Sequence, residues 1–290
     1  MSRILGLSAG NAGGSSEIVL CTALAAAGGA DVELVRLADL DLTSQADLDW
    51  LWEKLIECDG LIVSTSIMSR TMAASLKLLV DRLLGPNADA AIIEHLVALR
   101  RGGAEPTVPF RVDERVLKPR VAGFLAVGGS LTPQWKTLAL PLLHTITFSM
   151  HIAVVDQVVF SGAGTPHSIV LDDEALTRAA QLGANVAGQL GKAFDDVAYL
   201  GEPGLCPLCH LSVIELSGTG VACATCGARG TLRPDASVEW TDLNTSVLTM
   251  AEKRAHATEI QETAARHRDL AAEIAQRTAK IPAFDPVRPR

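Results

Sequence analysis

The chain is predicted to fold as an α/β protein: a five-stranded doubly wound parallel sheet, followed by a small metal-binding module and a long C-terminal helix. Three features of the sequence support this prediction. Short apolar runs alternate with helical patterns over residues 3–192. Two Cys-x-x-Cys pairs come next in the chain. An amphipathic pattern then repeats over residues 245–280.

The predicted strands are apolar runs, most of which end in loops rich in Gly, Ser and Thr. They span residues 3–7, 31–35, 60–65, 121–127 and 152–160. Helical patterns follow them at residues 17–27, 48–58, 73–84, 135–150 and 172–192. Because crossovers between parallel strands are right-handed, this alternation predicts parallel strands with helices on both faces of the sheet.

We expect the α/β domain to occupy residues 1–195, with residues 85–118 as a basic insertion that is helical only near 90–99. The insertion either lies over the loops at the carboxyl ends of the strands, where a ligand would bind, or forms a solvated loop. A metal module is expected at 200–240, an amphipathic helix at 245–280 and a tail without regular structure at 282–290. The apolar stripe of that helix needs cover from the parent domain or from a second subunit.

Composition excludes several classes of protein. The net charge of −8 argues against a nucleic-acid partner, which would need a basic face. The N-terminal apolar run leads at once into Gly and Asn, so no signal peptide is expected. The apolar stretch at 138–160 contains His144, His151 and Asp156, which predicts a buried helix and strand, not a membrane span. We expect a cytoplasmic protein in which Cys21 and Cys58 are small buried hydrophobes.

Four cysteines predict a structural metal site. Cys206 and Cys209 form one Cys-x-x-Cys pair, and after thirteen residues Cys223 and Cys226 form a second. This spacing brings four thiolates around one ion. The short interval with few aromatic residues is typical of a zinc-ribbon hairpin, so we favour zinc and keep a rubredoxin-like iron site as the alternative. A pair of disulfides would need an oxidising compartment, which nothing else in the sequence indicates.

The loop after the first strand is the candidate phosphate site. Its glycines allow backbone amides to converge on an anion, and the helix that follows begins with free amides and a positive dipole end. The candidate residues are Ser8, Asn11, Gly13, Gly14, Ser15 and Ser16. The loop contains no Lys or Arg, so neutral donors would hold the phosphate. It is neither a Walker A sequence nor a G-x-G-x-x-G fingerprint, which disfavours a nicotinamide as the resident cofactor.

The N-terminal domain resembles a known family. The resemblance lies in five segments: the strand at 4–8 with its Gly/Ser loop, residues 32–42, residues 56–66, the helix positions 76–82, and Gly128-Gly129. They are similar to flavodoxin-like NAD(P)H-dependent FMN reductases, especially the branch that contains iron–sulfur flavoproteins. The resemblance implies non-covalent FMN, NAD(P)H as co-substrate and a homodimer or homotetramer. Residues 43–49 lack the cysteines of the iron–sulfur branch, which excludes a cluster there.

The resemblance implies that two further loops hold the flavin ring at the carboxyl ends of the strands. Backbone amides would contact the polar edge of the ring, Arg70 would offset its negative charge, and Ile67, Met68 or Trp135 would cover it. The residues assigned to these loops are Ser66, Ile67, Met68, Ser69, Arg70, Gly128, Gly129, Ser130 and Trp135. We assign no side chain as a general acid, because the cofactor carries the hydride chemistry.

The function expected from this resemblance is an FMN-dependent oxidoreductase that passes hydride from NAD(P)H to a small acceptor such as a quinone or a free flavin. The metal module and the C-terminal helix would build the oligomer or wall the flavin pocket. Two alternatives remain open at this point. One is a non-catalytic flavodoxin-type electron carrier. The other is a zinc-ribbon interaction protein on a degenerate flavodoxin scaffold.

Overall fold

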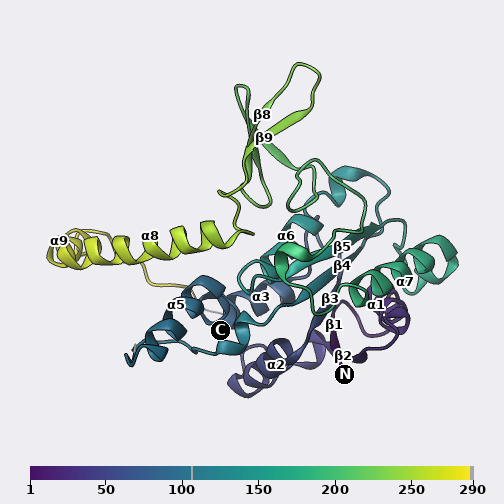
Figure 1. Cartoon of the computed structure of the whole chain (residues 1–290), viewed down its shortest axis with the longest axis horizontal. Helices are drawn as coiled ribbons and strands as arrows, with labels where there is room; N and C mark the ends of the chain where they lie inside the picture. The colour runs from purple at the N-terminus through teal and green to yellow at the C-terminus, as the bar shows by residue number, and fades with distance from the viewer. Residues whose placement is uncertain (106, 288–290) are drawn as a thin grey trace.

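The computed structural model describes residues 1–105 and 107–287, and its centre is a parallel sheet of five strands in the order β2-β1-β3-β4-β5. Figure 1 shows helices on both faces of this sheet. The strands are β1 Arg3–Ala9, β2 Asp31–Arg36, β3 Gly60–Ser66, β4 Val121–Val127 and β5 Ala153–Phe160. This strand order is that of flavodoxin-like folds, so the predicted fold class is confirmed.

Two helical layers cover the sheet. The helices α1 (Ser15–Ala26) and α7 (Asp173–Ala187) pack on one face, and α2 (Gln45–Glu57), α3 (Ala74–Leu83) and α6 (Ala139–Thr147) pack on the other. Side chains alternate between the two cores along each strand: Ile4 and Ile62 join the core under α1 and α7, whereas Leu5 and Val63 join the opposite core. Because both faces are covered, the strands are apolar throughout, which made them recognisable in the sequence.

The contact between α1 and α7 depends on one glycine. A Cβ atom placed on Gly183 of α7 would lie 1.9 Å from the carbonyl oxygen of Ala23 in α1. The absence of a side chain at Gly183 therefore allows the two helix backbones to approach more closely than any other residue would permit. This close packing holds the C-terminal half of α1, which carries Ala23, against α7.

The predicted helix at 135–150 is replaced by a 3-10 turn, η3 (Pro133–Trp135), and the shorter helix α6. Pro141 lies in the first turn of α6, where its missing amide hydrogen is tolerated; further inside a helix it would remove a hydrogen bond. The other 3-10 turns are η1 Leu37–Asp39, η2 Glu114–Leu117, η4 Ser168–Leu171 and η5 Phe194–Asp196.

None of the helices in the described part of the chain has the length and apolar character that a bilayer crossing requires.

The insertion at 85–118 contains the helix that was expected near residues 90–99. It forms α4 (Gly85–Ala88), α5 (Ala90–Arg101) and η2, and it contributes apolar side chains to the core. Its basic residues pair with α2 and with the residue that precedes β3. Arg111 bonds Asp49 at 2.5 Å, Arg115 bonds Glu53 at 2.8 Å, and Lys118 bonds Asp59 at 2.7 Å. These acidic partners were not foreseen from the sequence. The buried side chains of α5 and η2 show that the insertion is not simply a solvated loop, whereas a position over the binding loops stays a prediction.

The second sheet is antiparallel, with the strand order β6-β7-β8-β9, and it projects from the α/β domain (Figure 1). Its strands are β6 Ile214–Ser217, β7 Gly220–Cys223, β8 Arg229–Leu232 and β9 Val238–Asp242. Two hydrogen bonds attach the cysteine-bearing segment to strand β5. Gln157 Nε2 donates to the carbonyl of Cys209 at 2.7 Å, and the Leu200 amide donates to the carbonyl of Val155 at 2.7 Å.

The predicted C-terminal helix is divided into α8 (Met250–Asp269) and α9 (Ala271–Thr278), which together we call the arm. Thr249 caps α8 by accepting from the Glu252 amide at 3.2 Å, and Arg254 pairs with Glu94 of α5 at 2.9 Å. Beyond this base the arm projects away from the domain (Figure 1), and its large apolar side chains are exposed. Residues 282–287 of the predicted tail form no regular structure, and its last three residues lie outside the described chain.

Candidate functional site

The start of α1 has the features of an anion site. Gly14 occupies the N-cap position and supplies no side-chain cap, so the first-turn amides need an acceptor from elsewhere. The Ser15 Oγ atom beside them is buried and has no hydrogen-bond partner among the described residues. A buried hydroxyl without a partner is uncommon, because it loses its hydrogen bonds to water on folding. The residues present therefore fit a ligand with acceptor oxygens, such as a phosphate.

Ser16 and Ser66 connect this helix start to strand β3. Their hydroxyl oxygens lie 3.2 Å apart, although the residues belong to different predicted loops. A Cβ atom on Gly10 would lie 2.0 Å from Ser16 Oγ and 2.8 Å from Ser66 Oγ, so only glycine permits this meeting. The first two predicted loops thus form one continuous polar surface.

Glu17 and Arg36 were missed as part of this site. The Glu17 carboxylate is 5 % exposed and accepts from Arg36 Nε at 2.7 Å, Arg36 Nη2 at 2.9 Å, the Gly13 amide at 3.0 Å and Ser8 Oγ at 3.2 Å. The hydrogen bond from Arg36 is the main reason that the pKa of Glu17 lies below its ordinary value, against the opposing effect of burial. Because Glu17 also bonds Ser8 and Gly13, the Glu17–Arg36 pair fixes the conformation of the glycine loop.

Three of the predicted donors already have partners within the loop. The Ser8 hydroxyl is fully buried and bonded to Glu17, and the Gly13 amide is bonded to the same carboxylate. The Gly14 amide donates to the carbonyl of Asn11 at 2.9 Å, which closes the loop on itself. Ser8, Gly13 and Gly14 thus maintain the shape of the loop. Their donor groups are used by the buried carboxylate and by the turn in this structure, and their expected contact with a cofactor stays a prediction.

The loop after β3 is a tight two-residue hairpin turn. Met68 and Thr71 exchange backbone hydrogen bonds at 2.9 and 3.0 Å, and the two residues between them have positive φ, 48° at Ser69 and 78° at Arg70. Two consecutive non-glycine residues in this region are strained, and such strain concentrates at binding sites. The amides of Ser69 and Arg70 have no acceptor within the described residues, so this turn presents two donors.

The loop after β4 lies against the turn after β3. The Ile67 amide donates to the carbonyl of Val127 at 2.8 Å, and Arg70 Nε donates to the carbonyl of Gln134 at 2.7 Å. The Arg70 side chain therefore ties two loops together, a role that its sequence did not reveal. Gly128 lies close to Ile67, since a Cβ on Gly128 would be 3.1 Å from Ile67 Cδ1.

A fourth loop, residues 161–168 after β5, completes the site and was not assigned from the sequence. A Cβ on Gly129 would lie 2.8 Å from the Cα of Gly164, and Lys136 Nζ bonds Ser161 Oγ at 2.5 Å. At its other end, His167 Nε2 is 3.9 Å from the position of a Cβ on Gly13. The Gly-Ala-Gly-Thr-Pro sequence at 162–166 was the available signal, because it follows the carboxyl end of the fifth strand.

Three large apolar side chains are exposed on the second and third loops. Met68 is 59 % exposed, Leu131 is 76 % exposed and Trp135 is 56 % exposed. Apolar groups left in water at the carboxyl edge of a sheet are suited to a planar aromatic ligand. Asn11 is exposed on the first loop, and Ser130 Oγ lies 3.1 Å from Thr132 Oγ1 on the third.

The four predicted metal ligands converge as expected. The sulfur atoms of Cys206, Cys209, Cys223 and Cys226 all lie within 4.8 Å of one another, with 3.6 Å between Cys206 and Cys226 and 3.4 Å between Cys209 and Cys223. These separations suit a single ion with four thiolate ligands at about 2.3 Å each. His210 stacks on Tyr199 with ring centroids 3.7 Å apart, so it belongs to the packing around the cluster.

The buried His144 connects the cluster to the core. Its Nε2 lies 3.0 Å from Gln157 Oε1, and the amide nitrogen of Gln157 holds the Cys209 carbonyl. Burial lowers the pKa of His144 to about 4, so the ring is neutral at physiological pH. His144 is thus a core histidine, as the surrounding apolar run indicated. Cys58 is buried as expected, but Cys21 is exposed on α1, where its helix face meets solvent.

Comparison with known proteins agrees with this geometry. The sequence model of a family described as NADPH-dependent FMN reductase matches residues 2–165. The chain belongs to this family. A flavone synthase, cfoJ of Aspergillus candidus, is 35 % identical over 256 residues, which are 79 % of this chain and 77 % of that protein. A solved structure of a flavone reductase superposes with a TM-score of 0.82 and 29 % identity, over 98 % of this chain and 100 % of the other.

Membership of the family establishes the general activity. The protein is an NAD(P)H-dependent FMN oxidoreductase, as the resemblance of its sequence implied. This result disfavours the two alternatives, a non-catalytic electron carrier and a zinc-ribbon interaction protein on a degenerate scaffold. The appended cysteine module lies outside the matched residues 2–165.

Proposed function

We propose that FMN binds with its phosphate at the start of α1 and its ring between the loops after β3 and β4. The observation that carries this proposal is the buried, unpartnered Ser15 Oγ beside the open first turn of the helix. Ser15 and Ser16 would hold the phosphate oxygens through their hydroxyls and amides. The amides of Ser69 and Arg70 would face the polar edge of the ring, together with the Gly128–Ser130 segment.

FMN, when bound, supplies a ring that accepts hydride from NAD(P)H and delivers it to an acceptor. The residues of this chain bind and orient the ring and the acceptor. Trp135 and Met68 would cover the ring, and Leu131 would extend the apolar surface on which the acceptor lies. The Arg70–Gln134 hydrogen bond would hold the two covering loops at a constant separation.

We propose a planar conjugated carbonyl compound as the acceptor. Flavones fit this description, and two relatives carry flavone in their names. In the reductive direction, hydride and one proton add across the carbon–carbon double bond next to the carbonyl group, and NAD(P)H becomes NAD(P)⁺. The oxidative direction is the reverse of this step: the same hydride and proton leave the compound, and NAD(P)⁺ takes the hydride and becomes NAD(P)H. Quinones and free flavin, expected from the sequence, are the competing acceptors, because they have similar planar shapes.

We propose zinc as the ion of the cysteine cluster, with iron as the alternative. The short hairpin between the two cysteine pairs and the close sulfur separations support a compact four-thiolate site. The site has no open ligand position in this arrangement, so its role would be structural. Through Gln157, the cluster would keep the end of β5 and the loop that follows it in place.

We propose that the arm packs on a second copy of the chain in a homodimer or homotetramer. A groove of 580 Å³ runs between α5 and α8, with Leu96, Phe110 and Ile260 among its lining residues. Leu270 and Ile274 are exposed farther along the arm, beyond the part of α8 that lines this groove, and they would fill the groove of another copy.

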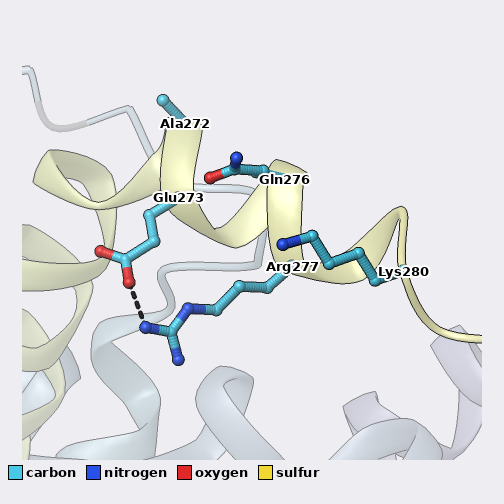
Figure 2. Close-up of a pocket in the computed structure, with 5 residues that line it drawn as sticks. All are labelled: Ala272, Glu273, Gln276, Arg277 and Lys280. Atoms are coloured by element: carbon cyan, nitrogen blue, oxygen red, sulfur yellow. Dashed lines mark ion pairs between the residues drawn. The ribbon is translucent and has the colours of Figure 1, made fainter.

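Figure 2 shows the flank of α9 that carries Glu273, paired with Arg277, and Gln276. This polar flank offers a matched control for the proposed interface. We expect Ile274→Glu to reduce the molar mass measured by light scattering to that of the monomer. Gln276→Glu adds the same charge on the polar flank and should leave the mass unchanged. An unchanged mass in the Ile274→Glu variant, or a monomeric wild type, would contradict the arm interface.

The cofactor site is tested by FMN titration of the apoprotein, followed by absorbance and fluorescence. We expect Ser15→Ala with Ser16→Ala to weaken FMN binding about tenfold or more, since two hydrogen bonds to a charged group are lost. Ser44→Ala changes a serine at the start of α2 and should bind FMN as the wild type does. Undiminished affinity in the double variant would refute the phosphate position. Rates of NADPH oxidation with flavone, quinone and free flavin then rank the acceptors.

A further inference from the structure

We propose that His167, on the loop after β5, is a second binding residue for the phosphate of FMN, facing the helix start from the opposite side of the glycine loop. The inference rests on the FMN position proposed above and assigns to it a residue that neither the sequence pattern nor the family match singles out. His167 lies just beyond the residues matched by the family, 2–165.

The position of His167 is set by its own loop. The Ser168 amide and hydroxyl both bond the carbonyl of Thr165, at 3.2 and 2.8 Å, and the Val170 amide bonds the carbonyl of His167 at 3.1 Å. Ile169 is buried in the core beneath α1 and α7 and anchors the turn. The backbone of His167 has φ 63° and ψ 0°, the left-handed conformation, at the start of this turn.

The imidazole lies beside the glycine loop. Its Nε2 atom is 3.9 Å from the position that a Cβ would occupy on Gly13, which has φ 69°. The missing side chain of Gly13 leaves the space between the imidazole and the loop open. Gly13 is two residues before Ser15, whose buried hydroxyl lacks a partner. A phosphate on the start of α1 would therefore lie within reach of the imidazole.

Two other histidines with positive φ show that the backbone conformation alone is not the argument. His151, with φ 53°, stacks on Phe194 at 3.9 Å, and His210, with φ 57°, stacks on Tyr199 at 3.7 Å. Their rings are used in packing. His167 is exposed, and within the described residues its ring has neither an aromatic partner nor a hydrogen bond. A ring held in place without a partner, next to an anion site, is available to a ligand.

Charge also favours this assignment. A phosphate monoester carries about −1.5 to −2 charges at neutral pH. The Arg36 guanidinium lies on the same loop through Glu17, but its Nε and Nη2 atoms both bond that carboxylate, so the pair adds no net charge. Lys136 is bonded to Ser161 at the far end of the same loop. An imidazole N–H adds a donor at the phosphate, and in its protonated form it adds positive charge.

The test compares FMN with riboflavin, which has the same ring but no phosphate. Apoprotein is titrated with each at one pH and one ionic strength, and dissociation constants are measured for wild type, His167→Ala and His167→Asn. We expect His167→Ala to weaken FMN binding about tenfold and riboflavin binding by less than about twofold, since only the phosphate loses a partner. Asn keeps a neutral donor and tolerates positive φ, so it should give an intermediate loss for FMN.

His95, exposed on α5, supplies the control: His95→Ala should leave both affinities unchanged. An unchanged FMN affinity in His167→Ala, or equal losses for FMN and riboflavin, would overturn the assignment. Equal losses would mean that the residue supports the loop without touching the phosphate. A wild type that binds FMN no better than riboflavin would refute the phosphate cradle itself. Melting temperatures of the apoproteins show whether each variant is folded. If His167→Ala destabilises the turn, the comparison of FMN with riboflavin is made with His167→Asn instead.

Discussion

Replacement of Glu17 by Gln should weaken the fold through a single buried charge. The side chain is 5 % exposed and accepts four hydrogen bonds, two of them from Arg36. Gln keeps the shape and one oxygen, but its amide nitrogen then faces a guanidinium donor. One charge-assisted hydrogen bond is lost, which contributes about 1.5–3 kcal/mol. Because Arg36 is 39 % exposed, water compensates it in part, and we expect a loss near 2 kcal/mol, about the lower end of that range.

The assay is urea unfolding of the apoprotein at pH 7, with zinc present, followed by circular dichroism. A lower midpoint with an unchanged slope would show that stability, and not the unfolded state, has changed. Glu33→Gln is the matched control, because Glu33 pairs with Lys54 at 2.8 Å near the surface of the sheet. We expect the control to lose less than about 1 kcal/mol.

The pH dependence separates charge from shape. Arg36 holds the pKa of Glu17 below its ordinary value of 4.5, so the carboxylate stabilises the fold above that pH. This contribution is lost as the pH falls through the lowered pKa, where the protonated wild type comes to resemble the Gln variant. The stability difference should therefore narrow as the pH is lowered below 4.5. Equal stability at pH 7, or a difference that stays constant down to pH 4, would refute the reasoning.

Two further variants test the packing and the metal cluster. Gly183→Ala should destabilise the protein by about 1–3 kcal/mol in thermal unfolding, because its Cβ would lie 1.9 Å from the Ala23 carbonyl oxygen. Gly188→Ala is the control: Gly188 directly follows the same helix, and its added Cβ would be 3.4 Å from the nearest atom, so stability should change by less than about 0.5 kcal/mol. Similar losses of stability in both variants would contradict the role of the contact between the helices. Cys209→Ser, or removal of zinc by a chelator, should unfold the second sheet. Metal analysis would show the loss of the ion, and hydrogen exchange would show the unfolding. Backbone amides of the second sheet that stay fully protected without metal would contradict a structural ion.

The sequence predicted the elements of the α/β domain well because its strands are buried on both faces. Runs such as Gly60–Ser66 and Val121–Val127 are apolar over their whole length, and each is followed by small polar residues. The cysteine pairs were equally informative, since metal ligation restricts both residue type and spacing. Helix ends were less accurate: Pro141 shortened α6, and the arm is divided near Leu270.

The parts of the site that sequence reasoning missed all depend on contacts between distant segments. Arg36 ends the second strand, and no role was assigned to it from the sequence. In the structure it pairs with Glu17, nineteen positions earlier. Arg70 ties two loops together through the carbonyl of Gln134. Neither contact follows from local propensity, because each depends on which strand ends lie side by side.

The amino-acid sequence by itself determined the order and type of the elements, the parallel sheet, the four-cysteine cluster and the family, because periodicity and motif spacing are local properties. Only the tertiary structure decided that the loop after β5 reaches the glycine loop after β1, and that Glu17 uses donors expected to serve a ligand. Close packing of α1 on α7 and the strand order β2-β1-β3-β4-β5 bring these groups together. Such contacts arise from the burial of whole faces and cannot be assigned to any one segment of the chain.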